Sequence, residues 1–325
     1  MGNTSETILE TKSIDERAAS EDDGIQSSWE QMATHHLSLK KPKDALNTAR
    51  YWRKAHPNSP KAMLFEAMAL LQMGETENAI KTIKEAVDVH PDFYSGWLYL
   101  NIIYSRENEL QEAMKCLQHA LSINNDLVEA WSQQGKMSLI EVNPQHALEC
   151  FDKAIALDPS RARSWNGKGV ALWFLGKLDD ASEAFSKAVE IKPNEAKYIG
   201  NLARVYYSNG KLRESRKYFE RAIELDKTEI GILNNYAILL MDLEIYDEAL
   251  KVFNECLRIN DSYATAYYNI ACLYTKTGDF DRAIENLKYA VSLFSGYCDI
   301  AVKDEGLQPI WNDARFLAIV GDETQ

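Results

Sequence analysis

Basic side chains are scarce in this sequence: 36 lysines and arginines face 49 aspartates and glutamates, and the formal net charge is −13. Attraction to nucleic-acid phosphates needs a basic surface, so the composition argues against a nucleic-acid partner. Long apolar runs are absent as well, since stretches such as residues 170–175 fall far short of the roughly 20 residues that span a bilayer. We therefore expect no membrane insertion.

Patterns of catalytic and metal-binding residues are also missing. None of the six histidines belongs to an HExxH motif, none of the five cysteines to a CxxC pair, and no glycine-rich loop could hold a phosphate. The sequence thus predicts no catalytic residue, no cofactor and no metal site. Reduced cysteines and the lack of a secretory segment favour the cytoplasm.

The dominant feature of the sequence is a period of 34 residues. Alanine recurs at this spacing, and Ser215 stands at the one step that alanine misses. The alanines are Ala45, Ala79, Ala113, Ala147, Ala181, Ala249 and Ala283. A fixed period of this length is typical of solenoids, in which each repeat packs only on its neighbours and binding takes place on the surface.

Eight blocks of 34 residues fit between Gln26 and Tyr297 without a gap. They cover residues 26–59, 60–93, 94–127, 128–161, 162–195, 196–229, 230–263 and 264–297. Position 4 of each block is large, position 8 is nearly always small, and glycine at position 15 and proline at position 32 mark turns. Large residues facing small ones suit two closely packed helices. The fifth block has the full pattern, with Trp165, Gly169, Leu172, Gly176, Ala181, Phe185, Ala188 and Pro193.

This pattern resembles the tetratricopeptide repeat family over residues 26–297. The resemblance implies an all-α fold, an α-α superhelix of eight helix-turn-helix repeats with a C-terminal capping helix. We expect the first helix of each repeat over positions 2–14 and the second over positions 17 to about 30. In the first block Ala49 and Trp52 exchange the usual large and small positions, and we expect the neighbouring helices to repack around them.

The two ends of the chain differ from the blocks. Residues 1–25 carry seven acidic side chains against two basic ones and no aromatic residue, so we expect a disordered acidic tail. Residues 298–325 are expected to cap the solenoid, with a short helix over 298–304 and a second helix that starts at Pro309. The apolar side chains of this second helix are Ile310, Trp311, Phe316, Leu317 and Val320.

Members of the family turn their first helices inward, so the resemblance implies a concave groove lined by positions 2, 5, 6 and 9. Position 6 carries asparagine in three consecutive blocks, at Asn201, Asn235 and Asn269. Because an asparagine amide can both donate to and accept from a peptide backbone, we predict that this ladder holds an extended segment of a partner. The alternative is that these amides bond neighbouring side chains or water.

Four basic residues are predicted to lie in the same groove near Asn166 at position 5. They are Lys136 and Arg204 at position 9 and Arg163 and Lys197 at position 2. In an acidic protein such a strip favours an acidic peptide or a chain-terminal carboxylate. The alternative is a solvated face whose cations pair with nearby acids. The two-carboxylate clamp of the family's chaperone-binding members is not matched by these positions.

The second and third blocks place apolar side chains at the inward positions instead. These residues, here called the apolar patch, are Leu64, Phe65, Met68, Leu98, Tyr99 and Ile102. An exposed patch of this kind needs a cover. The cover could be an apolar partner segment, a second copy of the chain, or the tail's own Ile8, Leu9 and Ile14. Closure of the superhelix would bury the patch without any ligand.

The sequence therefore predicts a non-enzymatic scaffold that binds other proteins, through extended or acidic segments held in its groove. One alternative is a regulatory or accessory subunit of an enzyme carried on another chain, or a co-chaperone. A second alternative is a structural homo-oligomer that associates through the apolar patch.

Overall fold

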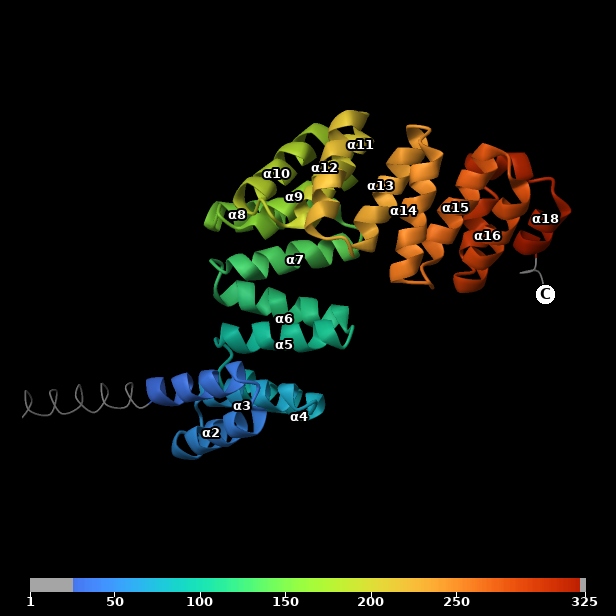
Figure 1. The fold of residues 1–325 in the computed structure, drawn as a ribbon. Coiled ribbons are helices and arrows are strands. Elements are labelled where there is room, and N and C mark those ends of the chain that lie inside the picture. The colour runs from blue at the N-terminus through green and yellow to red at the C-terminus, as the bar shows by residue number, and fades with distance from the viewer. Residues whose placement is uncertain (1–25, 322–325) are drawn as a thin grey trace, which may run out of the picture. The chain divides into compact units, whose positions relative to one another are not determined.

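The computed structural model describes residues 26–321, and within these residues every regular element is a helix (Figure 1). The helices follow one another in pairs joined by tight turns, which confirms the predicted all-α repeat fold. The acidic segment 1–25 and its predicted disorder lie outside the described residues. The chain forms two compact units, the first ending at Glu141 and the second beginning at Val142, so the boundary separates the two helices of the fourth block.

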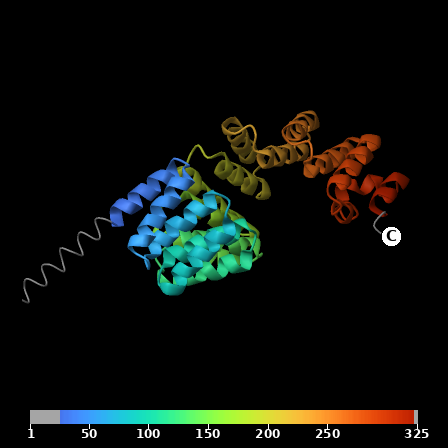
Figure 2. The same ribbon diagram turned by 90° about the horizontal axis from the view of Figure 1, so that it is seen from below.

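In the first unit residues 26–38 are helical, and from α2 to α7 each helix packs on the next. These helices are α2 (Pro42–Ala55), α3 (Pro60–Gln72), α4 (Thr76–Val89), α5 (Tyr94–Arg106), α6 (Leu110–Ile123) and α7 (Val128–Ile140). The second unit repeats the same succession from α8 to α16 (Figure 2). Its helices are α8 (Pro144–Leu157), α9 (Ala162–Phe174), α10 (Leu178–Ile191), α11 (Ala196–Ser208), α12 (Leu212–Leu225), α13 (Ile230–Asp242), α14 (Tyr246–Ile259), α15 (Ala264–Thr277) and α16 (Phe280–Leu293).

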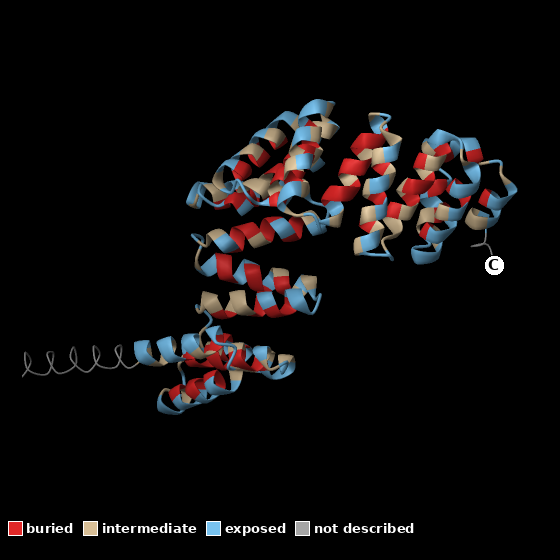
Figure 3. Ribbon diagram, in the orientation of Figure 1, coloured by how far each residue is buried: buried red, intermediate tan, exposed pale blue. Residues whose placement is uncertain are grey.

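The repeated alanines lie where helices touch, and all seven are 0% exposed. Buried residues gather on the sides of the helices that face their neighbours (Figure 3). Ser215, which replaces alanine in the sixth block, is equally buried, and its hydroxyl donates to the carbonyl oxygen of Ala203 at 2.8 Å. Serine is tolerated here because it is nearly as small as alanine and its polar atom has a partner.

Tryptophan at position 4 ties the start of a repeat to the turn before it. The indole N–H of Trp97 donates to the carbonyl oxygen of Pro91 at 3.0 Å. Trp165 makes the same bond to Pro159 at 2.8 Å, and Trp131 donates to the carbonyl six residues before it at 2.8 Å. The bond joins the first helix to the preceding turn, which explains why an aromatic residue with an N–H suits this position.

The first helices begin one residue earlier than predicted. In blocks two to seven they span positions 1–13, whereas the second helices span positions 17–30 as predicted. The helices α5, α7, α9, α11 and α13 begin at this position without a side-chain cap hydrogen bond. In α3 a cap is present, because Ser59 is the N-cap and its side chain accepts the N–H of Ala62 at 3.3 Å. Pro60 then takes the first helical position, where its missing N–H costs nothing.

The exchange in the first block is absorbed by repacking, as predicted. Ala49 and Trp52 are both 0% exposed, and the rings of Trp52 and Phe65 lie 6.0 Å apart between centroids. Phe65 is only 9% exposed, so it belongs to the core of the first unit rather than to an exposed apolar patch. The large side chain of this block thus lies one helical turn further along α2, and Phe65 of α3 packs against it.

The C-terminal segment caps the last helix pair, as predicted. It consists of α17 (Tyr297–Ala301), the 3₁₀ helix η1 (Glu305–Ile310) and α18 (Ala314–Gly321). Leu307, Ile310 and Phe316 are at most 2% exposed and share one core cluster with side chains of α15 and α16. The predicted helix start at Pro309 is wrong, because Pro309 lies inside η1 and the side chain of Asp313 accepts the N–H of Arg315 at 2.8 Å. This cap fixes the start of α18 at Ala314 instead.

Replacing Val142 with glycine is expected to stabilise the second unit by about 1 kcal/mol. Val142 is at position 15, which four other blocks fill with glycine, and it has a φ of +58° while 82% exposed. A β-branched residue is strained in this left-handed conformation. Urea unfolding should show the gain, and Val142→Ala, which keeps the Cβ atom, serves as the matched control. A lower midpoint for Val142→Gly than for the wild type would contradict a strained turn.

Candidate functional site

The asparagines predicted at the groove form hydrogen-bonded pairs between neighbouring first helices of the second unit. The side-chain N–H of Asn201 on α11 donates to the side-chain oxygen of Asn166 on α9 at 2.8 Å. On α15, Asn269 donates in the same way to Asn234 of α13 at 2.9 Å. We call these the two asparagine pairs. Both members of the first pair are half-buried, whereas Asn234 is only 5% exposed.

Each asparagine pair keeps hydrogen-bonding capacity to spare. Within residues 26–321, no further bond uses the side-chain nitrogen of Asn166 or the side-chain oxygen of Asn201. The pair therefore offers one donor and one acceptor side by side, which are the two groups that a peptide unit needs. The predicted alternative, bonding between neighbouring side chains, holds for one N–H of each pair. Further amide groups stay available on the half-buried Asn166, Asn201 and Asn269, whereas Asn234 is buried.

Asn235 differs from the other two members of the predicted ladder. Its counterpart position on α11 is Gly200, which has no side chain to accept its N–H. A Cβ atom on Gly200 would lie 2.9 Å from a side-chain carbon of Ile232, so close packing of α11 on α13 keeps this position small. The predicted ladder of three asparagines is thus two pairs with one single asparagine between them.

The predicted basic strip is divided between the two units. Lys136 lies on α7 in the first unit, and Arg163, Lys197 and Arg204 lie on α9 and α11 in the second. Lys136 and Lys197 are exposed, and neither forms an ion pair with an acid in the described part of the chain. Convergence of Lys136 with the other three residues stays a prediction, and pairing with nearby acids does not account for these two lysines.

Arg204, one of the predicted groove cations, lies against an aromatic ring. Its guanidinium carbon lies 4.4 Å from the centroid of the Trp173 ring, and burial lowers the pKa of Arg204. The indole N–H of Trp173 donates to the hydroxyl of Ser208 at 3.2 Å, which holds the ring in place. The sequence indicated Arg204 as a groove residue but gave no reason to join it to Trp173, 31 positions earlier on the neighbouring first helix.

A second set of polar contacts joins the C-terminal turns of the first helices α11, α13 and α15. The hydroxyl of Tyr207 on α11 donates to the carboxylate of Asp242 on α13, and burial together with this bond raises the pKa of Tyr207. The ammonium group of Lys276 on α15 lies 3.4 Å from the same carboxylate. The charge of Asp242 is therefore offset by Lys276 rather than by Arg204.

The predicted apolar patch of the first unit is smaller than the sequence implied. Phe65 is buried, and Leu64, Met68, Leu98 and Tyr99 are half-buried, which leaves Ile102 as its exposed member, at 43%. Burial raises the pKa of Tyr99 to about 12. Much of this surface is thus covered by the unit's own helices and does not require a ligand.

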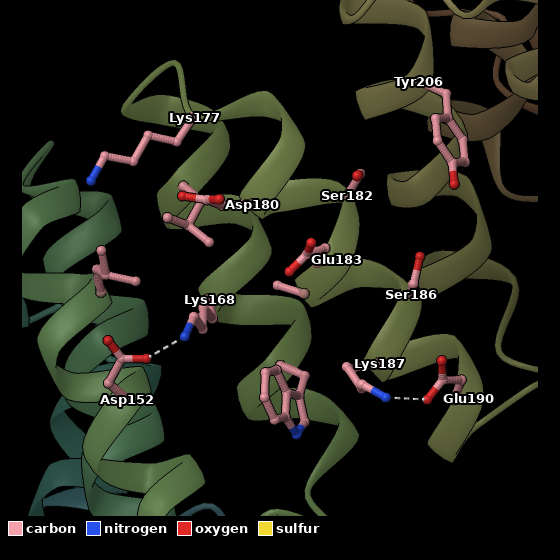
Figure 4. Close-up of a pocket in the computed structure, with 14 residues that line it drawn as sticks. Asp152, Lys168, Lys177, Asp180, Ser182, Glu183, Ser186, Lys187, Glu190 and Tyr206 are labelled. Atoms are coloured by element: carbon pink, nitrogen blue, oxygen red, sulfur yellow. Dashed lines mark hydrogen bonds and ion pairs between the residues drawn. The ribbon is translucent and has the colours of Figure 1, made fainter.

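A cavity that the sequence did not indicate lies among α8, α9, α10 and α11 (Figure 4). It has a volume of about 720 Å³, and the small residues Ser182, Ala184 and Ser186 of α10 leave it open. Ser182 stands at position 21, where most blocks have a large aliphatic residue, so this departure was the available signal. Two ion pairs lie in its walls, Lys168 with Asp152 at 2.7 Å and Lys187 with Glu190 at 2.8 Å.

The cysteines behave as packing residues. Cys116, Cys150 and Cys256 are at most 5% exposed, and burial raises the pKa of each thiol to about 11. In residues 26–321 no group of histidine, cysteine or carboxylate side chains is arranged to hold a metal ion. The helices of this same part of the chain are also too short or too polar to cross a membrane.

Comparison with known proteins gives the following matches. Two family models described as tetratricopeptide repeat match the chain, one over residues 31–92 and 66–126 and the other over 160–228 and 228–295. No curated protein sequence matches it. Solved structures share the fold at low identity, among them the three that follow, and at these identities the likeness concerns the fold alone.

The first of these structures is a tetratricopeptide repeat protein from Parabacteroides merdae, 18% identical with a TM-score of 0.64, covering 77% of this chain and 97% of that one. The second is the Cut9–Hcn1 hetero-tetramer of APC/C, 17% identical with a TM-score of 0.62, covering 90% of this chain and 55% of that one. The third is pilF from Pseudomonas aeruginosa, 20% identical with a TM-score of 0.55, covering 67% and 96%.

Proposed function

This chain belongs to the tetratricopeptide repeat family, and on that basis we propose that it is a non-enzymatic scaffold for other proteins. Repeats of this family generally mediate binding between proteins. The proposed ligand is an extended peptide segment bound along α9, α11, α13 and α15, on the surface that carries the two asparagine pairs and Arg204. We call this surface the asparagine face. We place the protein in the cytoplasm, where its cysteines stay reduced.

The observation that carries this proposal is the geometry of the asparagine pairs. Each pair links two neighbouring first helices. The half-buried pair Asn166–Asn201 leaves a donor and an acceptor unused, and in the other pair the side-chain oxygen of the half-buried Asn269 is unused among the described residues. Stacked helices lie about 8–10 Å apart, and an extended peptide advances about 3.3 Å per residue. Every third peptide unit of such a segment can therefore contact the asparagine face, one unit for each first helix. Because the asparagines would bind the peptide backbone, segments with many different side chains could bind.

Replacing Asn201, Asn235 and Asn269 together with alanine is expected to remove partners from the protein, because the backbone-directed amides are lost. The measurement is a pull-down from cell extract with wild type and variant, quantified by mass spectrometry. The control is Asn194→Ala/Asn254→Ala, which removes two exposed asparagines away from this face. Identical partner lists for wild type and the triple variant would end the claim that the asparagines bind ligand.

A structural homo-oligomer remains the second candidate, through Ile102 of the apolar patch. Light scattering on wild type and Ile102→Asp distinguishes the two functions, because a scaffold acting as a monomer keeps its mass in both. The roles of an enzyme's accessory subunit or of a co-chaperone are special cases of the scaffold, and the partners recovered in the pull-down would identify them.

A further inference from the structure

Arg204 differs from every other half-buried arginine in residues 26–321. Arg53 binds the carboxylates of Glu66 and Glu85, and Arg216 binds those of Glu220 and Glu248. The last of the group, Arg221, donates to the carbonyl oxygen of Pro193 at 2.6 Å. Arg204 has the ring of Trp173 as its only recorded partner among the described residues. Half-burial of a cation with no anion beside it carries a cost, and an anion from outside the chain would offset that cost.

The stacking on Trp173 leaves the binding groups of Arg204 in place and unused. A guanidinium carries its five N–H donors in one plane, directed outward from its edges, and no hydrogen bond to a described residue uses those of Arg204. Trp173 is itself fixed by its bond to Ser208 at 3.2 Å. The carboxylate of Asp242 on α13 is engaged by Tyr207 and Lys276. The geometry is therefore that of a preformed carboxylate site.

We propose that Arg204 binds the side-chain carboxylate of an aspartate or glutamate within the extended peptide that the asparagine pairs hold. This inference rests on the proposed function and adds a requirement for one acidic residue. Arg204 shares α11 with Asn201, and its ring partner Trp173 shares α9 with Asn166, so the cation lies on the same two helices as this pair. A side-chain carboxylate reaches it without ending the peptide there, so the peptide can continue to the pair Asn234–Asn269 on α13 and α15.

The test begins with a phage library of random twelve-residue peptides, flanked by linkers at both ends and selected on the full chain. We expect the selected peptides to share an acidic residue at one position. The strongest binder and its Glu→Gln or Asp→Asn version are then compared by fluorescence anisotropy. Removing the peptide's charge should weaken binding to wild type by roughly 30-fold, as expected for a hydrogen-bonded charge pair.

Protein variants complete a double-mutant cycle. On Arg204→Met the charged and neutral peptides should bind within about twofold of each other, because the partner of the carboxylate is gone. Arg213→Met is the matched control, since it removes one exposed arginine from the neighbouring helix α12 and should keep the full difference. Circular dichroism checks the fold of each variant, and the comparison of the two peptides on wild type needs no variant.

The outcomes separate this inference from the proposed function. Equal binding of charged and neutral peptides to wild type, with binding still lost in the triple asparagine variant, would overturn the role of Arg204 and leave the scaffold intact. Tighter binding of a peptide with its carboxyl terminus free at the same position would also overturn it, in favour of a terminal carboxylate. A selection that yields no peptide, or peptides indifferent to the triple asparagine variant, would overturn both proposals.

Discussion

Phe316→Ala is expected to destabilise the C-terminal end of the fold by about 4 kcal/mol, the largest single effect that this structure implies. Phe316 is 2% exposed and lies in the core cluster that joins α18 and η1 to α15 and α16. Truncating it removes most of an aromatic side chain and leaves a cavity between the capping segment and the last repeat. In a solenoid, the loss falls mainly on the nearest repeat.

The measurement is hydrogen exchange of the amides of α15 and α16, since repeat proteins need not unfold in one step. Their exchange should accelerate strongly in Phe316→Ala. The matched control is Leu317→Ala, one residue further along α18, which is 55% exposed and should change stability by no more than about 0.5 kcal/mol. Equal exchange in the two variants would mean that the segment does not cap the repeat.

Gly167→Ala is expected to destabilise the second unit by about 2 kcal/mol, although alanine is the better helix former. A Cβ atom at Gly167 would lie 2.3 Å from the Phe151 ring, far inside van der Waals contact. Overpacking of this severity costs about 3 kcal/mol, and the gain in helix propensity returns about 1 kcal/mol. The position is therefore glycine because α9 and α8 approach closely, not because the helix requires it.

Chemical unfolding of the full chain measures this effect, with Gly231→Ala as the control. Gly231 is exposed near the start of α13, and a Cβ atom there would meet only a carboxylate oxygen at 3.4 Å. That variant should be neutral or slightly stabilised. The double variant Gly167→Ala/Phe151→Leu should recover part of the loss, because a smaller side chain makes room. No loss in Gly167→Ala would refute the close packing of α8 on α9.

The period of 34 residues was sufficient to predict the helix pairs, because packing between repeats demands small residues at fixed steps. It could not predict which residue starts each first helix. The Ser59 cap marks the start of α3, whereas α5, α7, α9, α11, α13 and α15 start without a side-chain cap hydrogen bond. The helix start predicted at Pro309 is wrong for a different reason: proline is favoured in the first turn of a helix, but here it lies within η1. Burial of Phe65 followed from the position of the Trp52 ring, which the sequence pattern leaves open.

The sequence placed the asparagines and Arg204 on the first helices of their repeats but did not predict their contacts. Side chains on neighbouring first helices meet at a separation of 35 residues, as in Asn166–Asn201, Asn234–Asn269 and Trp173–Ser208. A period of 34 therefore brings position 5 of one block next to position 6 of the following block. Searching at this offset would have found the asparagine pairs, whereas the stacking of Arg204 on Trp173 depends on side-chain conformation and had no sequence signal.

The central claim is that the asparagine face is where peptides bind. It is tested most directly by photo-crosslinking with a selected peptide that carries a benzophenone group next to its acidic residue. Mass spectrometry then identifies the protein residues that are labelled. Our account predicts adducts on α9, α11 and α13, close to Arg204, and their loss in the triple asparagine variant. Adducts confined to the outer helices α10 and α12, or unchanged in that variant, would contradict it.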